Sequence, residues 1–391
     1  MSEWEQACLG DLVESFRVRV DPAELGDATV IHFSIPAFDD RMTPTVESAS
    51  GIRSHKFSVD EDSVLVSMLN PRIPRVWLAA GAKNALASTE FAVLRPNNPR
   101  MTLPFLYCLC RSSSFTSMLD ERSTGTTGSR KRSKAADVLA YTFFLPPPRV
   151  QEQIVEVIRA VDDQMAALDV EAEALNGVYQ AATSRLYCTA EGGEADSRFL
   201  GDVMHLDVVR TPMEAGKTYH LAGVLNAGKG LVDKDEFDGA DTEYSAMNIL
   251  RENQVVMRKL TAWEGPITVV PPEFDGFVAS NEFPTFTLTS DVAPGWMKHV
   301  CRTPRLWAEM KNRVVGTVQR RKRLNPDQLL SVALPVPSRP EQEKVAEALD
   351  AIEREVTAIH EEAARLRGVR ARLLSGLLDR SIDIRSAELG A

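Results

Sequence analysis

Two short basic runs are the residues of this sequence whose types and spacing most clearly indicate a chemistry. Gly125-Thr126 leads into Arg130-Lys131-Arg132, and Gly316-Thr317 leads into Arg321-Lys322-Arg323 at the same spacing. Guanidinium and ammonium groups neutralise nucleic-acid phosphates, and arginine can also bind the edge of guanine through two hydrogen bonds. A solvated charge run is the ordinary alternative, but the recurrence favours nucleic-acid contact. The predicted contacts are Gly125, Thr126, Arg130, Lys131, Arg132 and Lys134 in the first run, and Gly316, Thr317, Gln319, Arg320, Arg321, Lys322 and Arg323 in the second.

Two further pairs of basic residues extend this prediction. Arg72 and Arg75 follow one strand-like run, and Arg258 and Lys259 lie at the end of another, each pair roughly in the middle of its half of the chain. We expect both pairs at a position where a strand leads into a turn. All four residues are candidate nucleic-acid contacts, with ordinary surface placement as the alternative.

No arrangement of residues predicts a catalytic site or a metal site. The segment from Gly223 to Gly230 has phosphate-loop spacing around Lys229, but glycine replaces the Ser or Thr that should hold magnesium, and the fragment Gly216-Lys217-Thr218 lacks the first glycine. The sequence contains no G-x-S-x-G, H-E-x-x-H or G-x-G-x-x-G motif, and its six histidines show no metal-ligand spacing. We therefore expect a non-enzyme, with a nucleotide-dependent enzyme that uses Lys229 as an alternative.

The composition is that of a globular protein with more than one domain. Of 391 residues, 44% are hydrophobic and 26% charged, no window approaches 18 consecutive apolar residues, and the first residues are acidic and amphipathic. Together with five cysteines that form no C-x2-C pair, this predicts a cytoplasmic protein with reduced thiols and no contact with a membrane. The net charge of -10 is concentrated in residues 151–187, 188–197 and 341–378, so it does not exclude a DNA-binding face elsewhere.

The sequence repeats itself at an offset of about 191 residues. Leu9-Gly10-Asp11 recurs as Leu200-Gly201-Asp202, and Glu90-Phe91 recurs as Glu282-Phe283. Each copy then passes through a proline-rich hinge, Leu145–Pro148 in the first and Leu334–Pro337 in the second. A period of this length indicates two complete domains, because solenoid repeats have periods of roughly 20 to 50 residues.

A heptad pattern follows each hinge. Apolar residues alternate steps of four and three, which indicates paired, supercoiled helices, and the economical partner of each helix is the other copy. Gly177 and Gly368 interrupt the two patterns at the same place, where we expect close helix approach or a slight bend. The predicted seam residues are Ile154, Ile158, Val161, Met165, Leu168 and Leu175 in the first helix, and Val345, Leu349, Ile352, Val356, Ile359 and Leu366 in the second.

Before each helix, short strand-like runs alternate with Pro, Gly and Asn, which is typical of an α+β globular unit. We therefore predict an α+β fold with an internal repeat, in which two long helices pair as a coiled coil and each follows a globular domain. Short helical stretches, such as 296–311, supply the α part. The predicted boundaries are 1–150 and 198–340 for the globular domains, 151–187 and 341–378 for the helices, 188–197 for a linker and 379–391 for a tail.

The junction before the second helix has a distinctive pattern, in which Leu-Pro-x-Pro is followed by Glu-Gln and by the first heptad valine. The first copy keeps Gln151 and Ile154 but has Val150 where the glutamate aligns. The matching residues are Pro335, Pro337, Glu341, Gln342 and Val345, and Trp4 with Leu9-Gly10-Asp11 matches the start of a target-recognition domain. In these motifs and in its architecture, nearly the entire chain resembles the specificity subunit of type I restriction-modification enzymes.

This resemblance implies a non-catalytic subunit in which each globular domain reads one half of a split double-stranded DNA target. It also implies a pseudo-twofold relation between the two copies, with the two helices forming an antiparallel coiled coil that acts as a spacer. It implies two methyltransferase subunits as partners, which bind S-adenosylmethionine, and ATP-dependent restriction subunits in the full complex. No cofactor is expected in this chain. A coiled-coil scaffold or assembly protein without nucleic-acid binding would use the same heptads and stays open as an alternative.

Overall fold

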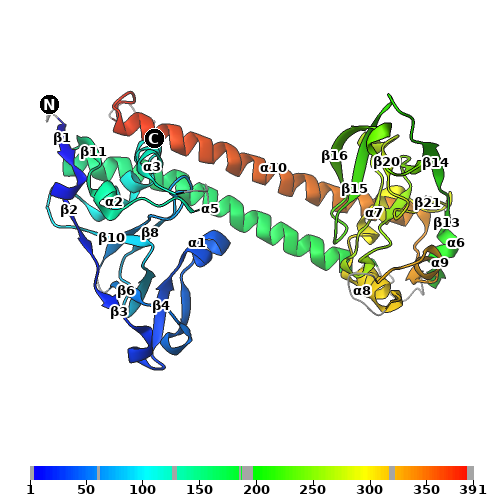
Figure 1. Cartoon of the computed structure of the whole chain (residues 1–391), viewed down its shortest axis with the longest axis horizontal. Helices are drawn as coiled ribbons and strands as arrows, with labels where there is room; N and C mark the ends of the chain where they lie inside the picture. Colours follow the sequence, from blue (N-terminus) through cyan, green and yellow to red (C-terminus); the bar gives the residue numbers. More distant parts are fainter. Residues whose placement is uncertain are drawn as a thin grey trace. The chain divides into compact units, whose positions relative to one another are not determined.

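The computed structural model describes residues 4–59, 62–125, 130–184, 186, 197–316 and 322–384, which form two compact units (Figure 1). Unit 1 comprises Met1–Asp169 with Glu361–Ala391, and unit 2 comprises Val170–His360. Two long helices, α5 (Pro148–Ser184) and α10 (Arg339–Leu378), each contribute residues to both units. Each unit therefore combines a globular region with one part of each long helix.

The described strands of unit 1 form a four-stranded sheet in the order β2-β10-β7-β8, a five-stranded sheet in the order β3-β6-β9-β4-β5, and a β1-β11 pair. Only the β4-β9 pair of the five-stranded sheet is parallel. The strands are β1 Glu5–Cys8, β2 Val13–Phe16, β3 Arg19–Val20, β4 Thr29–Phe33, β5 Thr45–Ser48, β6 Lys56–Val59, β7 Ser63–Ser67, β8 Val76–Ala79, β9 Ala85–Ser88, β10 Phe91–Pro96 and β11 Thr142–Leu145. The short helices are α1 Ile35–Arg41, α2 Leu103–Cys110, α3 Ser113–Arg122 and α4 Ala135–Leu139.

Unit 2 repeats this topology strand for strand. Its sheets have the orders β13-β21-β18-β19, β14-β17-β20-β15-β16 and β12-β22, and the parallel pair recurs as β15-β20. The strands are β12 Ser197–Phe199, β13 Met204–Leu206, β14 Val209–Pro212, β15 Thr218–Val224, β16 Leu231–Asp238, β17 Ala246–Ile249, β18 Val255–Met257, β19 Ile267–Val269, β20 Val278–Ala279, β21 Thr285–Leu288 and β22 Ala333–Pro335. The short helices are α6 Leu200–Val203, α7 Pro294–Val300, α8 Pro304–Arg313 and α9 Pro326–Leu330. The internal repeat of the sequence is thus a repeat of the fold.

The four-stranded sheet of each unit is buried on both faces. Val64 and Val66 of β7 belong to a core shared with the helices, whereas Leu65 belongs to the core shared with the five-stranded sheet. In unit 2, Val255 of β18 faces the helical core and Val256 faces the other sheet. Successive side chains of a strand point to opposite faces, so a run of consecutive apolar residues suits a strand between two cores.

A buried glutamine fixes the start of each long helix. Gln151, which is fully buried, accepts a hydrogen bond from the Thr102 N–H at 3.0 Å and donates to the Pro146 carbonyl at 2.8 Å. Gln342, also fully buried, accepts from the Ala293 N–H at 2.7 Å and donates to the Pro337 carbonyl at 2.8 Å. The glutamine at each junction therefore joins the hinge, the long helix and the residue that directly precedes α2 or α7.

Within unit 1, the first part of α5 runs antiparallel to the last part of α10. Ile154 and Ile158 share a core with Leu374 and Leu377. Farther along α5, Asp162 accepts a hydrogen bond from Arg370. Among the predicted seam residues of this unit, Ile154, Ile158 and Leu168 are buried, and Val161, Met165 and Leu366 are partly buried.

Within unit 2, the last part of α5 packs with the first part of α10. Tyr179 and Leu186 share a core with Ala346 and Leu349, and Ile352 packs against it. Among the predicted seam residues of this unit, Leu349 and Ile359 are buried, and Leu175, Val345, Ile352 and Val356 are partly buried.

The structure corrects three details of the sequence interpretation. A Cβ atom added at Gly177 or Gly368 would meet no atom within 4 Å, so neither glycine serves close helix approach. The long helices begin at Pro148 and Arg339, slightly before the predicted boundaries of 151 and 341, because proline is tolerated in the first turn of a helix. The expected helical stretch 296–311 is two helices, since Pro304 begins α8.

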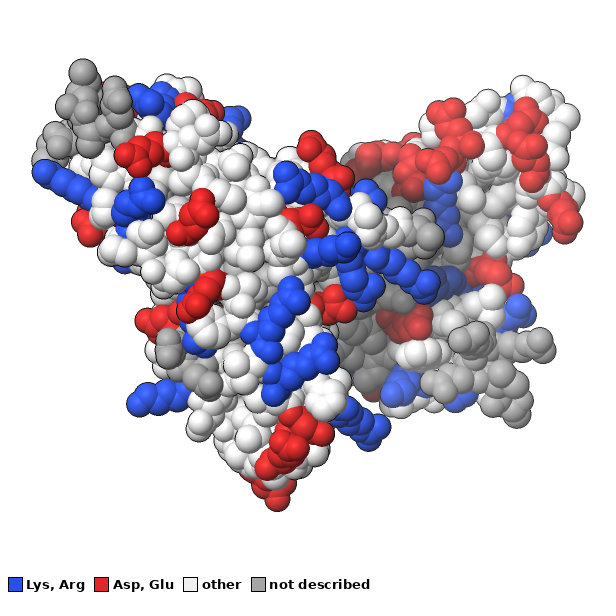
Figure 2. Space-filling view, turned by 60° about the vertical axis from the view of Figure 1, so that its left-hand side comes forward, with Lys and Arg blue, Asp and Glu red and all other residues white. Residues whose placement is uncertain are grey.

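Charged side chains are unevenly spread over the surface. Figure 2 shows groups of Lys and Arg on the near face of unit 1 and a cluster of carboxylates at its lower tip.

Within the described ranges, no helix is both long and apolar enough to cross a membrane. Cys8, Cys108, Cys110 and Cys301 are free thiols, and burial raises the pKa of Cys108 to about 11.

Candidate nucleic-acid interface

Both predicted basic runs lie in loops that are closed in the same way. In unit 1, Thr124 and Arg132 exchange two backbone hydrogen bonds of 2.9 Å, and in unit 2 Val315 and Arg323 exchange two of the same length. An added Cβ at Gly125 would lie 2.8 Å from the Arg130 carbonyl oxygen, so this close approach requires glycine. The predicted contacts Thr126, Thr317, Gln319, Arg320 and Arg321 lie outside the residues that the structure describes.

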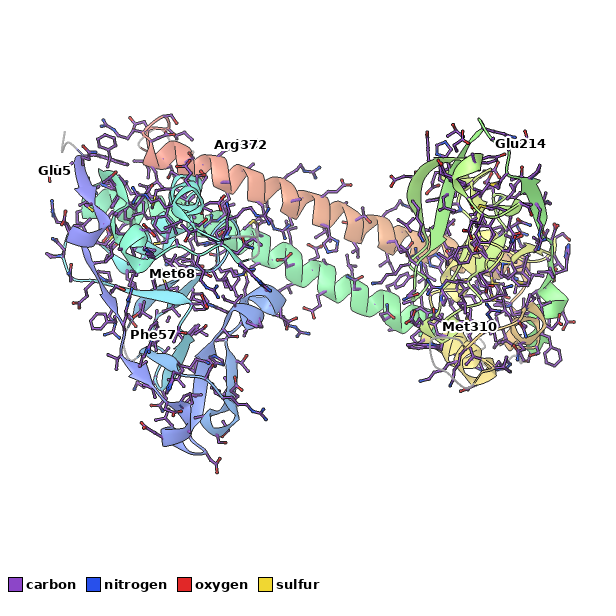
Figure 3. The ribbon with its side chains drawn as sticks, viewed as in Figure 1. Glu5, Phe57, Met68, Glu214, Met310 and Arg372 are labelled. Carbon is purple, nitrogen blue, oxygen red and sulfur yellow. The ribbon has the colours of Figure 1, made fainter. Side chains whose placement is uncertain are left out.

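Each loop is hydrogen-bonded to the turn that follows β7 in unit 1 or β18 in unit 2. The Asn70 N–H donates to the Lys131 carbonyl at 2.8 Å, and the Thr261 N–H donates to the Lys322 carbonyl at 3.2 Å. The turn begins at Met68 in unit 1, labelled in Figure 3, and the corresponding residue of unit 2 is Lys259. We call residues 68–75 and 259–266 the central turns. In each unit, the basic loop and the central turn therefore form one continuous surface.

Arg132 and Arg323 are engaged by equivalent carboxylates. Arg132 Nη2 lies 2.9 Å from Glu90 Oε1, and Arg323 Nη2 lies 3.3 Å from Glu282 Oε1. The hydrogen bonds that Arg132 donates to the Glu90 carboxylate raise the pKa of Arg132 above its ordinary value. Both guanidinium groups are about half exposed, so these arginines hold the end of the loop and still face solvent.

The remaining predicted cations differ in exposure. Arg72 and Arg130 are exposed, and Lys131, Lys259 and Lys322 are partly exposed. Lys134 is exposed at the first position before α4, where its N–H donates to Asp137. These six side chains are accessible to a phosphate group.

Arg75 is not accessible to a phosphate group in this structure. Its side chain is only 9% exposed, and its guanidinium donates to both carboxylate oxygens of Asp39 on α1, at 2.6 and 2.9 Å. A bidentate ion pair of this kind uses the same hydrogen-bond donors that phosphate would need. The sequence interpretation of Arg75 as a direct contact is therefore corrected.

Arg258 is likewise engaged within the protein. It donates to the Leu260 carbonyl at 3.0 Å, to Asn226 Oδ1 and Thr261 Oγ1 at 2.7 Å, and to Glu264 Oε2 at 3.3 Å. The predicted pair Arg258 and Lys259 is also not the structural equivalent of the pair Arg72 and Arg75. The Arg258 N–H donates to the Pro266 carbonyl, and the corresponding backbone hydrogen bond of unit 1 runs from the Ser67 N–H to the Arg75 carbonyl. Arg258 thus takes the place of Ser67, and sequence spacing alone could not reveal this difference.

The phosphate-loop interpretation of Lys229 fails on topology. Residues 225–230 form a tight connection between the antiparallel strands β15 and β16, closed by the Leu225 N–H to Gly230 carbonyl bond of 3.0 Å. A phosphate loop instead leads into a helix, whose N-terminus binds the anion. Lys229 is exposed in this connection.

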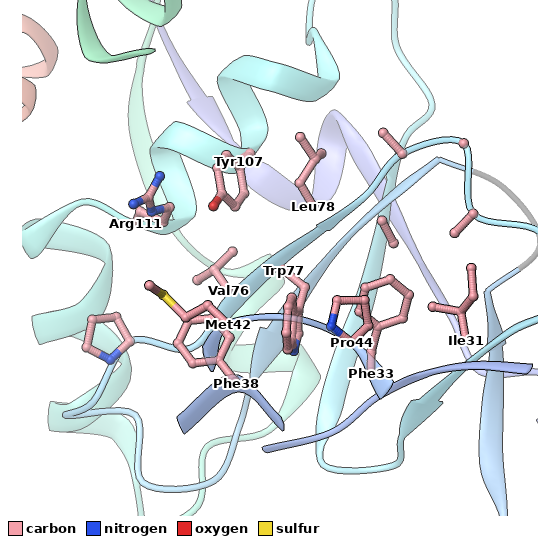
Figure 4. A pocket seen from close by; sticks show the side chains of 15 residues that line it. Ile31, Phe33, Phe38, Met42, Pro44, Val76, Trp77, Leu78, Tyr107 and Arg111 are labelled. Atoms are coloured by element: carbon pink, nitrogen blue, oxygen red, sulfur yellow. The ribbon is translucent and has the colours of Figure 1, made fainter. Parts of the chain in front are cut away.

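A cavity of about 460 Å³ opens in unit 1 between α1, β8 and α2 (Figure 4). Its walls include Trp77, whose ring meets Phe33 and Phe38 edge to face at 5.3 and 5.0 Å, and Tyr107 and Arg111 lie at one end. Among the described residues that line it, none is a carboxylate, histidine or cysteine. The cavity therefore offers no pair of nucleophile and base.

Polar clusters lie at equivalent places in the two helix pairs. In unit 1, Asp162 of α5 accepts from Arg370 of α10 at 2.5 Å and from Arg111 after α2 at 2.9 Å. The equivalent residue of Arg370 in unit 2 is Tyr179, which is hydrogen-bonded to His299 of α7 at 2.9 Å. In the sequence, Arg370 is a polar residue within the second heptad pattern, and this interruption is the available signal for the cluster.

His299, Asp350 and Glu353 have ligand atoms close enough to hold a metal ion. However, Lys298 forms ion pairs with both Asp350 and Glu353, and Arg302 forms one with Glu353. These cations already neutralise the carboxylates. Burial and the neighbouring Lys298 lower the pKa of His299 to about 4, so the imidazole is neutral at pH 7. We therefore interpret the cluster as structural.

The geometry defines a class of protein: a duplicated α+β unit built on two antiparallel helices, with an exposed basic loop and a central turn in each copy. A scan against protein-family models finds no match to this chain, and a search of curated proteins finds none either. Solved structures, in contrast, match nearly the whole chain.

One similar chain comes from a structure described as the basis of complex assembly and conformational transition of the type I R-M system. It is 17% identical, the match covers 97% of this chain and 98% of that chain, and the TM-score is 0.62. Another is the type I restriction-modification system S subunit from M. genitalium, at 14% identity, 96% coverage of both chains and a TM-score of 0.55. The chain therefore has the fold of a type I restriction-modification S subunit.

Proposed function

We propose that the chain is the DNA-specificity subunit of a type I restriction-modification complex and recognises a bipartite DNA sequence. The observation that carries this proposal is the repetition of one complete fold within one chain, together with the likeness of the whole chain to S subunits. Two equivalent globular units suit a target with two half-sites, because each unit meets the duplex through the same surface.

The basic loops and the central turns form the DNA-binding surface of each unit. Lys131, Arg130 and Arg72 in unit 1, and Lys322 and Lys259 in unit 2, bind phosphates or base edges. Phosphate contacts fix the register of a protein on DNA, and contacts to base edges provide the sequence specificity. The duplicated loop provides the first kind of contact at both half-sites.

The two long helices act as the spacer between the half-sites. A helix rises about 1.5 Å per residue, so its length sets a distance, and its packing sets a rotational phase. Two modest readers on a stiff connection bind cooperatively only when both half-sites have the right separation. The antiparallel seams and the buried clusters at Asp162 and His299 support such a stiff connection.

The chemistry of the complex takes place on partner chains. Two methyltransferase subunits provide the S-adenosylmethionine site and the catalytic residues, and restriction subunits provide the ATP-dependent activity. This chain binds no cofactor of its own in this proposal. A subunit of this kind acts on chromosomal DNA in the cytoplasm.

Mapping methylated adenines in genomes with and without the gene for this chain tests the proposal. We expect a motif of two short half-sites with a constant gap that is lost on deletion and restored by the full-length chain. A chain-dependent motif without a gap, or an unchanged pattern after deletion, contradicts the proposal. The coiled-coil scaffold alternative predicts in addition that the purified chain with its methyltransferase partner binds all duplexes equally or not at all.

A further inference from the structure

An arginine in each unit ties the central turn to the segment between two paired strands of the five-stranded sheet, β4 and β5 in unit 1 and β15 and β16 in unit 2. In unit 2 this segment is the connection 225–230, and in unit 1 it is α1. Neither arginine is free to bind a phosphate, yet both lie against the surface proposed to bind DNA. The following inference rests on that proposed function and concerns how the surface is positioned.

Arg258 links three separate pieces of unit 2. Its guanidinium donates to Asn226 in the connection and to Leu260, Thr261 and Glu264 in the central turn. Thr261 in turn donates through its N–H to the carbonyl of Lys322 in the basic loop. A single planar group, on a side chain that is 26% exposed, therefore joins the connection to the turn and, through Thr261, to the loop.

The backbone around Arg258 needs such support. Thr261 has a φ of 55° and Ala227 a φ of 54°. Residues other than glycine rarely adopt this left-handed region, and a β-branched residue such as threonine adopts it least readily. Strained conformations of this kind persist only where the surroundings fix them. Arg258 supports this one by donating to Thr261 Oγ1 and to the Leu260 carbonyl at once.

Unit 1 makes the same link from a different sequence position. Arg75, at the end of the central turn, forms its bidentate ion pair with Asp39 of α1. Pro266 stands at the position of Arg75 in unit 2, and Ser67 stands at the position of Arg258 in unit 1. Two diverged copies thus connect equivalent segments with unrelated arginines, so the link does not follow simply from the duplication.

We propose that Arg258 and Arg75 are positioning residues that fix the connection 225–230 and α1 against the central turns, and thereby determine the base selectivity of one half-site each. The fold does not depend on Arg258 alone, because the Ala227 N–H to Glu264 carbonyl bond of 2.8 Å and the Gly228 N–H to Gly265 carbonyl bond of 2.9 Å remain without it. Loss of the arginine releases the orientation of the surface rather than unfolding the unit.

The test measures selectivity and salt dependence separately. The full-length chain, co-purified with its methyltransferase partner, selects ligands from a random duplex DNA library, and binding of the selected duplexes is then measured over a range of salt concentrations. Arg258→Ala is compared with Lys322→Ala, which removes a proposed phosphate contact from the basic loop of the same unit. Arg313→Ala serves as the matched control, since it removes an arginine whose partners are Glu309 and Ser331.

For Arg258→Ala we expect about a tenfold or greater loss of discrimination at one half-site, an unchanged second half-site and an unchanged salt slope. Arg75→Ala should affect the other half-site. A phosphate contact at Arg258 would instead lower the slope of log K against log salt by about 0.9, as we expect for Lys322→Ala. That result, or equal loss at both half-sites, overturns the inference.

A second variant keeps the inference testable if Arg258→Ala folds poorly. Asn226→Ala removes the acceptor in the connection and leaves the cation in place, so a positioning role predicts the same selective loss, whereas a phosphate contact at Arg258 predicts none. Failure of the proposed function gives a different result, because the unaltered chain would then select no bipartite duplex at all.

Discussion

Replacing Asp162 with alanine tests the buried cluster that joins the two helices of unit 1. Asp162 is the common partner of Arg370, whose side chain is 9% exposed, and of Arg111, whose side chain is 26% exposed. The substitution leaves two guanidinium groups without their carboxylate. Removing one partner of a buried ion pair costs about 3 to 5 kcal/mol because the other charge stays desolvated.

Partial exposure lowers this estimate. Asp162 itself is 26% exposed, so water screens part of the loss and we expect unit 1 to be destabilised by about 2 to 3 kcal/mol. With a urea dependence of about 2 to 3 kcal/mol per M, the midpoint of its unfolding falls by about 1 M. Hydrogen exchange of the α10 segment 361–378 during the titration reports on unit 1 specifically.

Asp169 provides the matched control on the same helix. Its ion pair with Arg367 spans 3.8 Å, and both side chains are more than half exposed. Exposed ion pairs contribute about 0 to 1 kcal/mol, so Asp169→Ala should leave the midpoint nearly unchanged. Equal effects of the two substitutions, or a larger effect in unit 2 than in unit 1, would refute the assignment of Asp162 to a buried cluster.

Three further predictions concern stability and binding. The folded pKa of His299 is about 4, whereas an unfolded histidine titrates near 6.5, so the unfolded chain binds the proton first as the pH falls. Unit 2 is therefore fully stabilised above pH 6.5 and loses stability as the pH falls towards 4. Thermal unfolding over this pH range measures the dependence, and His299→Gln should flatten it. Gln342→Ala leaves the buried Ala293 N–H without its acceptor, so we expect the free energy of unfolding to fall by about 2 to 3 kcal/mol. Glu347→Ala, at an exposed position of the same helix, is the neutral control. Equal effects of the two substitutions would contradict the role of the glutamine. Lys322→Ala should lower the salt slope of DNA binding by about 0.9 for one lost phosphate contact, and an unchanged slope would exclude that contact.

The sequence predicts the architecture well because its signals are periodic. Heptads predict the two long helices, and the offset of 191 residues predicts two equal units. The family resemblance, and not the heptads, predicted the antiparallel order of α5 and α10. The order of the strands within each sheet could not be predicted, because strand pairing depends on contacts between distant residues such as Ile31 and Ala85.

The candidate site is harder to predict because spacing does not reveal partners. Arg75 and Arg72 look alike in the sequence, yet Arg75 meets Asp39, 36 residues earlier, and Arg72 is exposed. Arg258 finds Asn226 in a connection that itself resembled a phosphate loop. A cation pattern therefore identifies a basic surface, whereas only the fold separates the residues that face solvent from those that hold the surface together.

The gap between the two half-sites tests the central claim most directly. Deleting one heptad from each helix, 163–169 from α5 and 362–368 from α10, removes about 10 Å of helix, and a base pair advances about 3.4 Å. Mapping methylated adenines in cells with the shortened chain should then give a motif with the same two half-sites and a gap shorter by up to about three base pairs. An unchanged gap, or altered half-site sequences, would contradict the role of the helices as the spacer between two readers.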